Sequence, residues 1–178
     1  LGDQMACGAG TVLSVEQVDA VAAAGGRIIV SPNTNPAVIR RAVELGLDPA
    51  PGFGSATEAF AALEAGARHL KLFPAVTYGF AHVRQLQAVL PPAAVVWAVG
   101  GVGADDMSQW WGAGCRAFGI GSEIFKPGQE VEQTAPEHKD DGPFSIGEGA
   151  DERGEFDQLT FLQCGVRGHH RLPRSEEH

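Results

Sequence analysis

The segment His69-Leu70-Lys71-Leu72-Phe73-Pro74 predicts a short buried strand that carries a lysine near its middle. Lys71 is the only lysine among the first 125 residues. Burial disfavours the ammonium form of a lysine and lowers its pKa, which leaves a free amine that can attack a carbonyl group. The alternative is a lysine at a strand end, whose aliphatic chain is buried while its ammonium group reaches water. Both interpretations place Lys71 on a strand.

Strands of the same kind recur on both sides of this segment, and each is followed by a helical pattern. The six predicted strands are Met5–Val12, Arg27–Ser31, Asp48–Gly54, His69–Pro74, Val95–Val102 and Ala117–Gly121. Because parallel strands need crossover connections, this alternation predicts an α/β fold with a parallel sheet. A doubly wound sheet and a (β/α)₈ TIM barrel both fit the pattern.

Three of the predicted helices begin with recognisable caps. Ser14 is followed by Gln17, and Ser55 by Glu58, which is the spacing of a capping box. Asn35 precedes a proline, which suits the first position of a helix. The apolar periodicity further predicts core-facing side chains on these and later helices. The predicted core-facing residues include Ile39, Ala42, Val43, Ala59, Phe60, Leu63, Val83, Leu86 and Val89.

The alternation of strands and helices ends near residue 134, where the composition changes. Residues 1–130 carry 8 Lys and Arg against 11 Asp and Glu, whereas residues 131–178 carry 5 against 11. The second part is acidic, rich in glycine and poor in large apolar side chains, which is typical of disordered segments. We therefore expect one α/β domain over residues 1–134 and an acidic, disordered tail over residues 135–178.

Charge and cysteine usage exclude several classes of protein. The net charge is −9 and no part of the chain carries a basic stripe, so nucleic acid is not an expected partner. No apolar run approaches the length that spans a membrane. Cys7, Cys115 and Cys164 lie far apart and are odd in number, which predicts no disulfide framework and fits a reducing compartment.

The motifs also argue against a dinucleotide site and a metal site. Gly8-Ala9-Gly10 begins like a dinucleotide-binding fingerprint, but Leu13 stands where the third glycine belongs. The histidines lack the spacing of metal ligands. His69 lies two residues from Lys71 and can share its side of the strand, where we expect a hydrogen-bonded or solvated histidine. Trp97 is expected to be a packing residue.

Glycine clusters follow the last two predicted strands. They are Val99-Gly100-Gly101-Val102 and Gly119-Ile120-Gly121-Ser122. Glycines let the backbone come close to a ligand, and in barrels the loops after strands seven and eight commonly bind phosphate. The clusters therefore predict a phosphate site, the alternative being turn glycines without a ligand. In a barrel numbered in this way Lys71 lies on strand six, and strands one and two would precede Leu1.

Six motifs occur in an order and spacing that resemble one family of aldolases. They are Gly8–Val12, Val30–Asn33, Pro51-Gly52, Leu70–Pro74, Ala98–Val102 and Gly119–Ser122. Together they resemble the class I aldolases of the 2-keto-3-deoxy-6-phosphogluconate and 4-hydroxy-2-oxoglutarate family, which release pyruvate. The resemblance covers residues 1 to about 134. The segments Tyr78-Gly79-Phe80 and Gly121–Phe125 are closer to the branch that acts on 6-phosphogalactonate derivatives.

The resemblance implies a TIM barrel and a role for individual residues. Lys71 would form a Schiff base with the C2 ketone of the substrate, and the iminium would draw electrons from the breaking C3–C4 bond. Thr11 would hold the carboxylate of the pyruvyl half. The walls of the pocket around that half would be Pro32, Pro51 and Phe73. The contacts to the phosphate and sugar would come from Gly100, Gly101, Val102, Gly121 and Ser122. No cofactor or metal is implied, because the iminium polarises the substrate.

The resemblance further implies a cytoplasmic homotrimer that binds a phosphorylated 2-keto-3-deoxy sugar acid. The family's arginine on strand one and its acid/base glutamate on strand two have no positions in this sequence, and its last helix has no counterpart after Ala135. We therefore expect strands three to eight, with the first two βα units missing. The alternatives are a 2-keto-3-deoxy-6-phosphogluconate aldolase, another phosphate-binding barrel enzyme with a structural Lys71, or an inactive barrel fragment.

Overall fold

The computed structural model describes residues 6–120 and 160–162 of the 178-residue chain. Its strands are β1 (Gly8–Gly10), β2 (Ile28–Val30), β3 (Asp48–Ala50), β4 (Gly52–Phe53), β5 (His69–Leu72), β6 (Val95–Val99), β7 (Ala117–Ile120) and β8 (Thr160–Leu162). Its helices are α1 (Val15–Ala23), α2 (Pro36–Glu44), α3 (Ala56–Glu64), α4 (Ala75–Gln87) and α5 (Met107–Ala113), with the 3₁₀ turn η1 (Ala104–Asp106) before α5. The predicted strands are all present, each shorter than its predicted range.

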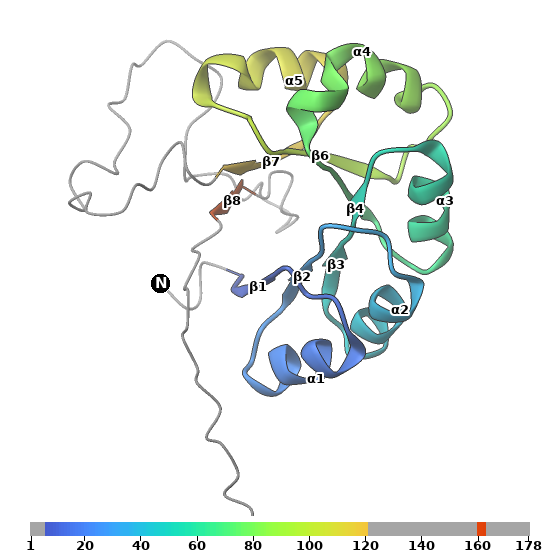
Figure 1. Ribbon diagram of the computed structural model, residues 1–178, viewed down its shortest axis with the longest axis vertical. Helices are drawn as coiled ribbons and strands as arrows, with labels where there is room; N and C mark the ends of the chain where they lie inside the picture. The colour runs from blue at the N-terminus through green and yellow to red at the C-terminus, as the bar shows by residue number, and fades with distance from the viewer. Residues whose placement is uncertain (1–5, 121–159, 163–178) are drawn as a thin grey trace, which may run out of the picture.

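The strands pair in the order in which they occur along the chain. β1, β2 and β3 form one parallel ladder, and β4 to β8 form a second. A doubly wound sheet reverses its strand order at a switch point, so this sequential order is that of a barrel wall. The strands form an arc that carries the helices on its outer side (Figure 1).

Pro51 divides the third predicted strand into β3 and β4. β3 pairs with β2, whereas β4 pairs with β5 on the other side. Proline has no N–H for a ladder hydrogen bond, but its carbonyl remains an acceptor. The carbonyl of Pro51 accepts a hydrogen bond from the N–H of Lys71 at 2.9 Å. Pro51 therefore marks the point where the chain leaves the ladder with β2 and joins the ladder with β5, and its carbonyl is hydrogen-bonded to β5.

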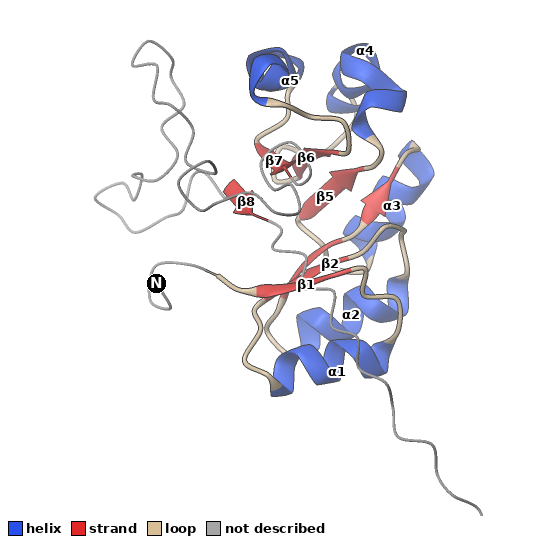
Figure 2. Ribbon diagram, turned by 60° about the vertical axis from the view of Figure 1, so that its left-hand side comes forward, coloured by secondary structure: helices blue, strands red, loops and turns tan. Residues whose placement is uncertain are grey.

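Alternate residues of the strands face two different cores. Ile28 and Val30 of β2 pack with Trp97 and Val99 of β6, although these strands are not neighbours. Contact between them requires a sheet that curls toward itself, as the wall of a barrel does. Ile29, between the two inward residues, packs outward with side chains of α1 and α2. Figure 2 shows α1 and α2 along one part of the arc and α4 and α5 along another.

The predicted helix caps are confirmed. Ser14 with Gln17 and Ser55 with Glu58 form complete capping boxes at the starts of α1 and α3. Asn35 caps α2 through its side chain. Each cap satisfies backbone N–H groups that the first turn of a helix leaves without partners. The caps fix where each helix begins after the carboxyl end of a strand.

Three predicted core side chains are exposed instead. Val43, Phe60 and Val89 are 44%, 45% and 57% exposed, respectively. Each lies next to a smaller or better-placed residue that takes the buried position. The buried neighbours are Ala42, Ala59 and Leu90. For Val43 and Phe60 the reason is that adjacent residues point about 100° apart around a helix, so a narrow apolar face buries one and leaves the other at its border. Val89 was predicted in a helix but lies in the turn after α4, which ends at Gln87.

Of the predicted tail, residues 135–178, the structure describes Thr160–Leu162. These residues form β8, which runs parallel to β7 with Phe118 opposite Thr160 and Ile120 opposite Leu162. The sequence predicts no strand here. The rest of the predicted tail lies outside the described residues. In the part of the chain that is described, none of the helices has the length and apolar character needed to cross a bilayer.

Candidate active site

The carboxyl ends of the parallel strands gather the predicted site residues at one edge of the sheet. Thr11 follows β1, Pro32 follows β2, and Phe73 follows β5. Pro51 lies between β3 and β4, and Lys71 belongs to β5. Gly100, Gly101 and Val102 follow β6, whereas Gly121 and Ser122 lie outside the described residues. Apart from the last two, the predicted set therefore comes together on one edge, where barrel enzymes place their catalytic groups.

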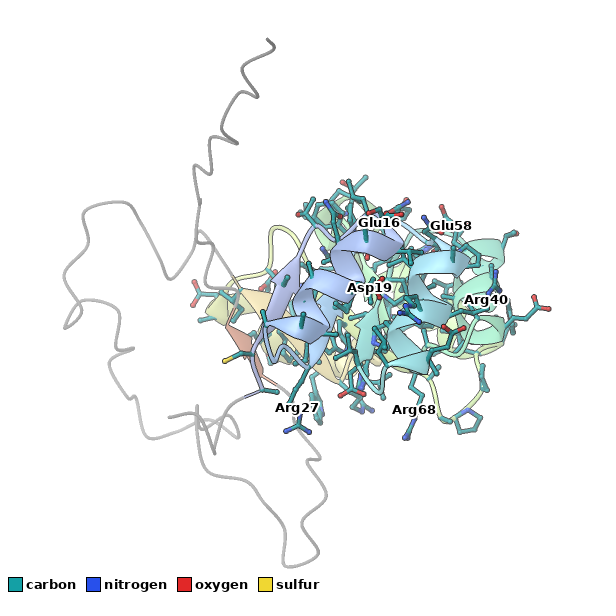
Figure 3. The ribbon with its side chains drawn as sticks, turned by 90° about the horizontal axis from the view of Figure 1, so that it is seen from below. Glu16, Asp19, Arg27, Arg40, Glu58 and Arg68 are labelled. Atoms are coloured by element: carbon teal, nitrogen blue, oxygen red, sulfur yellow. The ribbon has the colours of Figure 1, made fainter. Side chains whose placement is uncertain are left out.

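Two acidic and two basic side chains lie at opposite ends of the parallel strands. Glu16 and Glu58 lie in the first turns of α1 and α3, at the carboxyl edge. Arg27 and Arg68 directly precede β2 and β5, and Figure 3 shows them on the opposite side of the molecule from the two glutamates. The arginines that precede these strands therefore lie away from the edge that carries the site.

Lys71 lies on the inner face of β5. Its Cα is paired with those of Gly52 on β4 and Trp97 on β6. Leu70 and Leu72, on either side, pack outward in the helix-facing core. The lysine is only 6% exposed, and its Nζ lies 4.4 Å from the ring centroid of Phe73. The predicted buried, strand-borne lysine is therefore confirmed.

Burial lowers the pKa of Lys71 below its ordinary value. The ring of Phe73 attracts an ammonium group, an interaction of about 0.5–1 kcal/mol at exposed sites, but the cost of removing the charge from water acts in the opposite direction. The ion pairs formed within the described residues join Arg41 to Asp19 and Glu44, and none involves Lys71. The site thus makes the neutral, nucleophilic amine easier to form than it is for a lysine in water.

Lys71→Met is expected to increase stability at neutral pH, because it replaces a buried amine with an apolar chain of similar length. The lowered pKa means that the unfolded chain binds more protons than the folded chain between the folded and unfolded pKa values of Lys71. Wild-type stability therefore rises with pH through that window. The advantage of the variant should shrink over the same window in urea-unfolding measurements. An advantage that does not change with pH would contradict the lowered pKa.

Pro32 and Gly52 form a close backbone contact beside Lys71. A Cβ atom added to Gly52 would overlap the carbonyl group of Pro32 and lie 2.8 Å from the N of Asn33. Pro51, which precedes Gly52, is fully buried. Pro51-Gly52 is one of the motifs of the family resemblance, but the sequence predicts no role for Gly52 itself. Only glycine lets the loop after β2 approach β4 at this point.

Ser31 joins the ends of the first two strands. Its hydroxyl donates to the carbonyl of Val12 at 2.7 Å, and the side chain is buried. The N–H of Val12 in turn donates to the carbonyl of Val30 at 3.1 Å. These bonds hold the turn that carries Thr11, which has φ of 59°. A β-branched residue is strained in this left-handed region, and such strain is typical of functional sites.

The Gly100-Gly101 turn packs on the segment that follows Lys71. Their φ angles are 92° and 72°, values that favour glycine. An added Cβ would lie 3.2 Å from the Phe73 ring at Gly100 and 2.8 Å from Val76 at Gly101. The N–H of Val76 donates to the carbonyl of Gly100 at 3.1 Å. Val102 is buried in the helix-facing core, so its side chain is directed away from this turn.

Helix α4 also contacts the loop after β4. His82 Nε2 lies 2.8 Å from the carbonyl oxygen of Gly54, and the rings of Tyr78 and His82 are 4.8 Å apart. A Cβ on Gly54 would overlap the Tyr78 hydroxyl. α4 is interrupted at Gly79, which has φ of 75° and ψ of 171°. In the sequence, Tyr78 stands out only through the family resemblance, because no local pattern predicts a contact across the intervening strand.

Comparison with known proteins agrees with this geometry. Residues 2–135 match the family model for KDPG and KHG aldolases. The chain belongs to the KDPG and KHG aldolase family. It is 52% identical over 134 residues to the 2-dehydro-3-deoxy-6-phosphogalactonate aldolase of Escherichia coli K12, a match that covers 75% of this chain and 65% of the relative. The chain thus spans less than two thirds of the length of that aldolase.

Two solved structures of aldolases are similar to this chain. A structure described as native KDPGal is 51% identical, with a TM-score of 0.73, and the match covers 75% of this chain and 65% of that one. The KDPG aldolase of Legionella pneumophila, which holds pyruvate as a covalent carbinolamine, is 27% identical, with a TM-score of 0.56 and coverage of 61% and 52%. The arc of parallel strands and outer helices therefore corresponds to part of an aldolase barrel.

Proposed function

We propose that this protein is a class I aldolase that cleaves 2-dehydro-3-deoxy-6-phosphogalactonate to pyruvate and glyceraldehyde 3-phosphate. The observation that carries the proposal is Lys71, a buried lysine with a lowered pKa on the inner face of β5. The carbinolamine in the Legionella aldolase supports lysine chemistry in the family. Identity of 52% to the phosphogalactonate enzyme, against 36% to a phosphogluconate aldolase, supports the galactonate substrate.

The proposed reaction begins when the neutral amine of Lys71 attacks the C2 ketone and water leaves. The iminium formed is a cation that accepts the electron pair of the C3–C4 bond as this bond breaks and the C4 hydroxyl gives its proton to a base, the role that the family resemblance gives to the acid/base glutamate. Glyceraldehyde 3-phosphate departs, the pyruvyl enamine is protonated at C3, and hydrolysis returns the amine. In this scheme Phe73, Pro32 and Pro51 form walls around the pyruvyl group, and Thr11 binds its carboxylate.

Phosphate recognition in this proposal rests on backbone N–H groups. Gly100 and Gly101 provide a turn without Cβ atoms at the carboxyl edge, whereas Arg27 and Arg68 lie at the other edge. Successive backbone amides can bind an anion without a cationic side chain. Gly121 and Ser122 would complete this contact. Their role is proposed from the family resemblance, since they lie outside the described residues.

The proposed enzyme is a complete barrel, of which the described strands form one part. We place β1 to β7 as strands three to eight of a (β/α)₈ barrel, in which β3 and β4 together make one strand. Two further βα units would supply the arginine and the acid/base glutamate that the family resemblance implies. We further propose a homotrimer in the cytoplasm. The exposed, free thiol of Cys7 fits a reducing compartment.

Pyruvate release from the two substrates that differ at C4 tests the proposed activity. We expect the phosphogalactonate derivative to be cleaved faster than the phosphogluconate derivative, with lactate dehydrogenase and NADH reporting pyruvate. Lys71→Met is the matched control and should release pyruvate only at the background rate. Faster cleavage of the phosphogluconate derivative would overturn the substrate choice. Equal rates in the wild type and the control would overturn the enzyme assignment.

A further inference from the structure

His69 and Trp97 form a hydrogen-bonded pair beside Lys71. The indole Nε1–H of Trp97 donates to Nδ1 of His69 at 3.1 Å, and the two rings meet edge to face with centroids 5.3 Å apart. Lys71 is paired with Trp97 across the β5–β6 ladder, and His69 lies two residues before Lys71 on the same face of β5. The pair therefore lies along the same inner surface as the lysine.

Trp97 lies among apolar side chains. Trp97 is 2% exposed and packs inside the arc with Ile28, Val30 and Ala117. A buried indole N–H needs an acceptor, because losing its hydrogen bond to water is costly. His69 provides one. The two residues thus close the inner face of β5 and β6 on the amino-terminal side of Lys71.

The hydrogen bond from Trp97 requires that His69 be neutral. Imidazole can accept at Nδ1 only when it is neutral and carries its proton on Nε2, whereas imidazolium has donors on both nitrogens. Protonation of His69 would therefore break the bond to Trp97. The imidazolium would also add a positive charge to the same inner surface on which Lys71 must form its cationic iminium.

We propose that His69 and Trp97 are positioning residues for Lys71, and that their hydrogen bond keeps the inner surface beside the lysine uncharged so that its cationic iminium can form. This inference rests on the proposed function and deepens it. Neither residue contacts the reacting atoms in this account. They act through the electrostatic environment of the lysine.

Other charges around His69 are few. Burial lowers the pKa of His69, Asp48 at the start of β3 opposes this shift, and Arg68 adds to it. Lys71 is the remaining ionisable group on β5. The ladder partners of β5 on β4 and β6, among the described residues, have no titratable side chains. The indole donor is therefore a feature of the site that can be removed without changing a charge.

Trp97→Phe removes the N–H group and keeps an aromatic ring. Neutral His69 then loses a bond that its protonated form never had, so the pKa of His69 should rise. We expect a rise of about half to one pH unit, the size of one neutral hydrogen bond. His69→Asn is the matched variant, because an amide oxygen can accept from Trp97 but cannot titrate.

The experiment has two readouts on the full-length chain. NMR titration of the His69 ring gives its pKa and tautomer, and borohydride trapping with pyruvate gives iminium yield against pH. Trp97→Phe should move the acid limb of the trapping profile upward by the same amount as the pKa of His69. In His69→Asn the part of the trapping profile that follows the titration of His69 should be missing. Adding Trp97→Phe to that variant should not shift the profile further. Thermal unfolding checks that each variant folds.

The outcomes separate this inference from the proposed function. A pKa shift at His69 without a shift in the trapping profile, or an equal loss of trapping at every pH, would overturn the positioning role and leave the aldolase assignment standing. A protonated Nδ1 in the NMR spectra would also overturn it. A wild-type chain that traps no pyruvate at any pH would overturn the proposed function, and the positioning role with it.

Discussion

Lys71→Met is expected to reduce cleavage of the phosphorylated keto-deoxy acid by about 10⁴-fold or to the background rate. The substitution removes the only amine that the inner face of β5 presents, and with it the iminium through which the C3–C4 bond breaks. Methionine keeps an unbranched chain of similar length in the space between Trp97 and Phe73. The loss should therefore appear in pyruvate release while the folded structure remains.

Arg68→Met provides the matched control. Arg68 is an exposed cation three residues before Lys71 and directly precedes β5 at the opposite edge of the sheet. Its removal should leave pyruvate release within about twofold of wild type, since surface substitutions away from special features cost little. Equal losses in the two variants would contradict a specific role for Lys71. The variants are compared by initial rate and by midpoint of thermal unfolding.

Gly52→Ala is expected to destabilise the protein by about 3 kcal/mol, the upper range for overpacking a dense core. The new methyl group would overlap the backbone carbonyl of Pro32, which cannot turn aside as a flexible side chain does. Because Gly52 is paired with Lys71, displacement of β4 or of the Pro32 loop should also reduce pyruvate trapping. Urea unfolding followed by circular dichroism measures the first effect.

Gly112→Ala is the matched control for this substitution. Gly112 lies within α5, and an added Cβ would meet nothing within 4 Å. Alanine in an open helical position should stabilise the protein by about 0.5–1 kcal/mol, because glycine loses more chain entropy on folding. If Gly52→Ala were as stable as wild type, the close approach of the Pro32 loop to β4 would be wrong.

Local sequence patterns predicted the features that depend on neighbouring residues. The capping boxes at Ser14 and Ser55 form as expected, because their partners lie three residues away on the same turn. The strand that carries Lys71 was predicted from its apolar flanks, and the lysine is buried. What the sequence left open was the winding of the sheet. The sequential strand order and the contact between β2 and β6 resolve it in favour of a barrel wall.

Contacts between distant segments were missed. The pairing of Trp97 with His69, of His82 with Gly54, and of Gly52 with the Pro32 loop each joins residues on different strands or helices. These contacts depend on how the sheet brings distant segments together. The periodicity of a single segment carries no information about that arrangement. A glycine in a strand and a histidine beside a lysine were the signals available, and each is consistent with several environments.

Helix faces were predicted too broadly. The apolar stripes of α2 and α3 included Val43 and Phe60, which are exposed because alanines beside them take the positions against the strands. Small side chains allow a helix to approach a sheet closely, so the contact is narrow and larger neighbours remain at its border. Ala42 and Ala59 were predicted on the same stripes and are buried, so the error lies in the width of the predicted face and not in its position.

Borohydride reduction in the presence of pyruvate, followed by proteolysis and mass spectrometry, tests most directly whether the buried amine is the reactive group. The account predicts a single reduced pyruvyl adduct, on the peptide that contains Lys71, at neutral pH. The chain offers Lys126 and Lys139 as internal comparisons, since both lie outside the strand that carries the site. An adduct on either of these lysines, or no adduct on Lys71, would contradict the account.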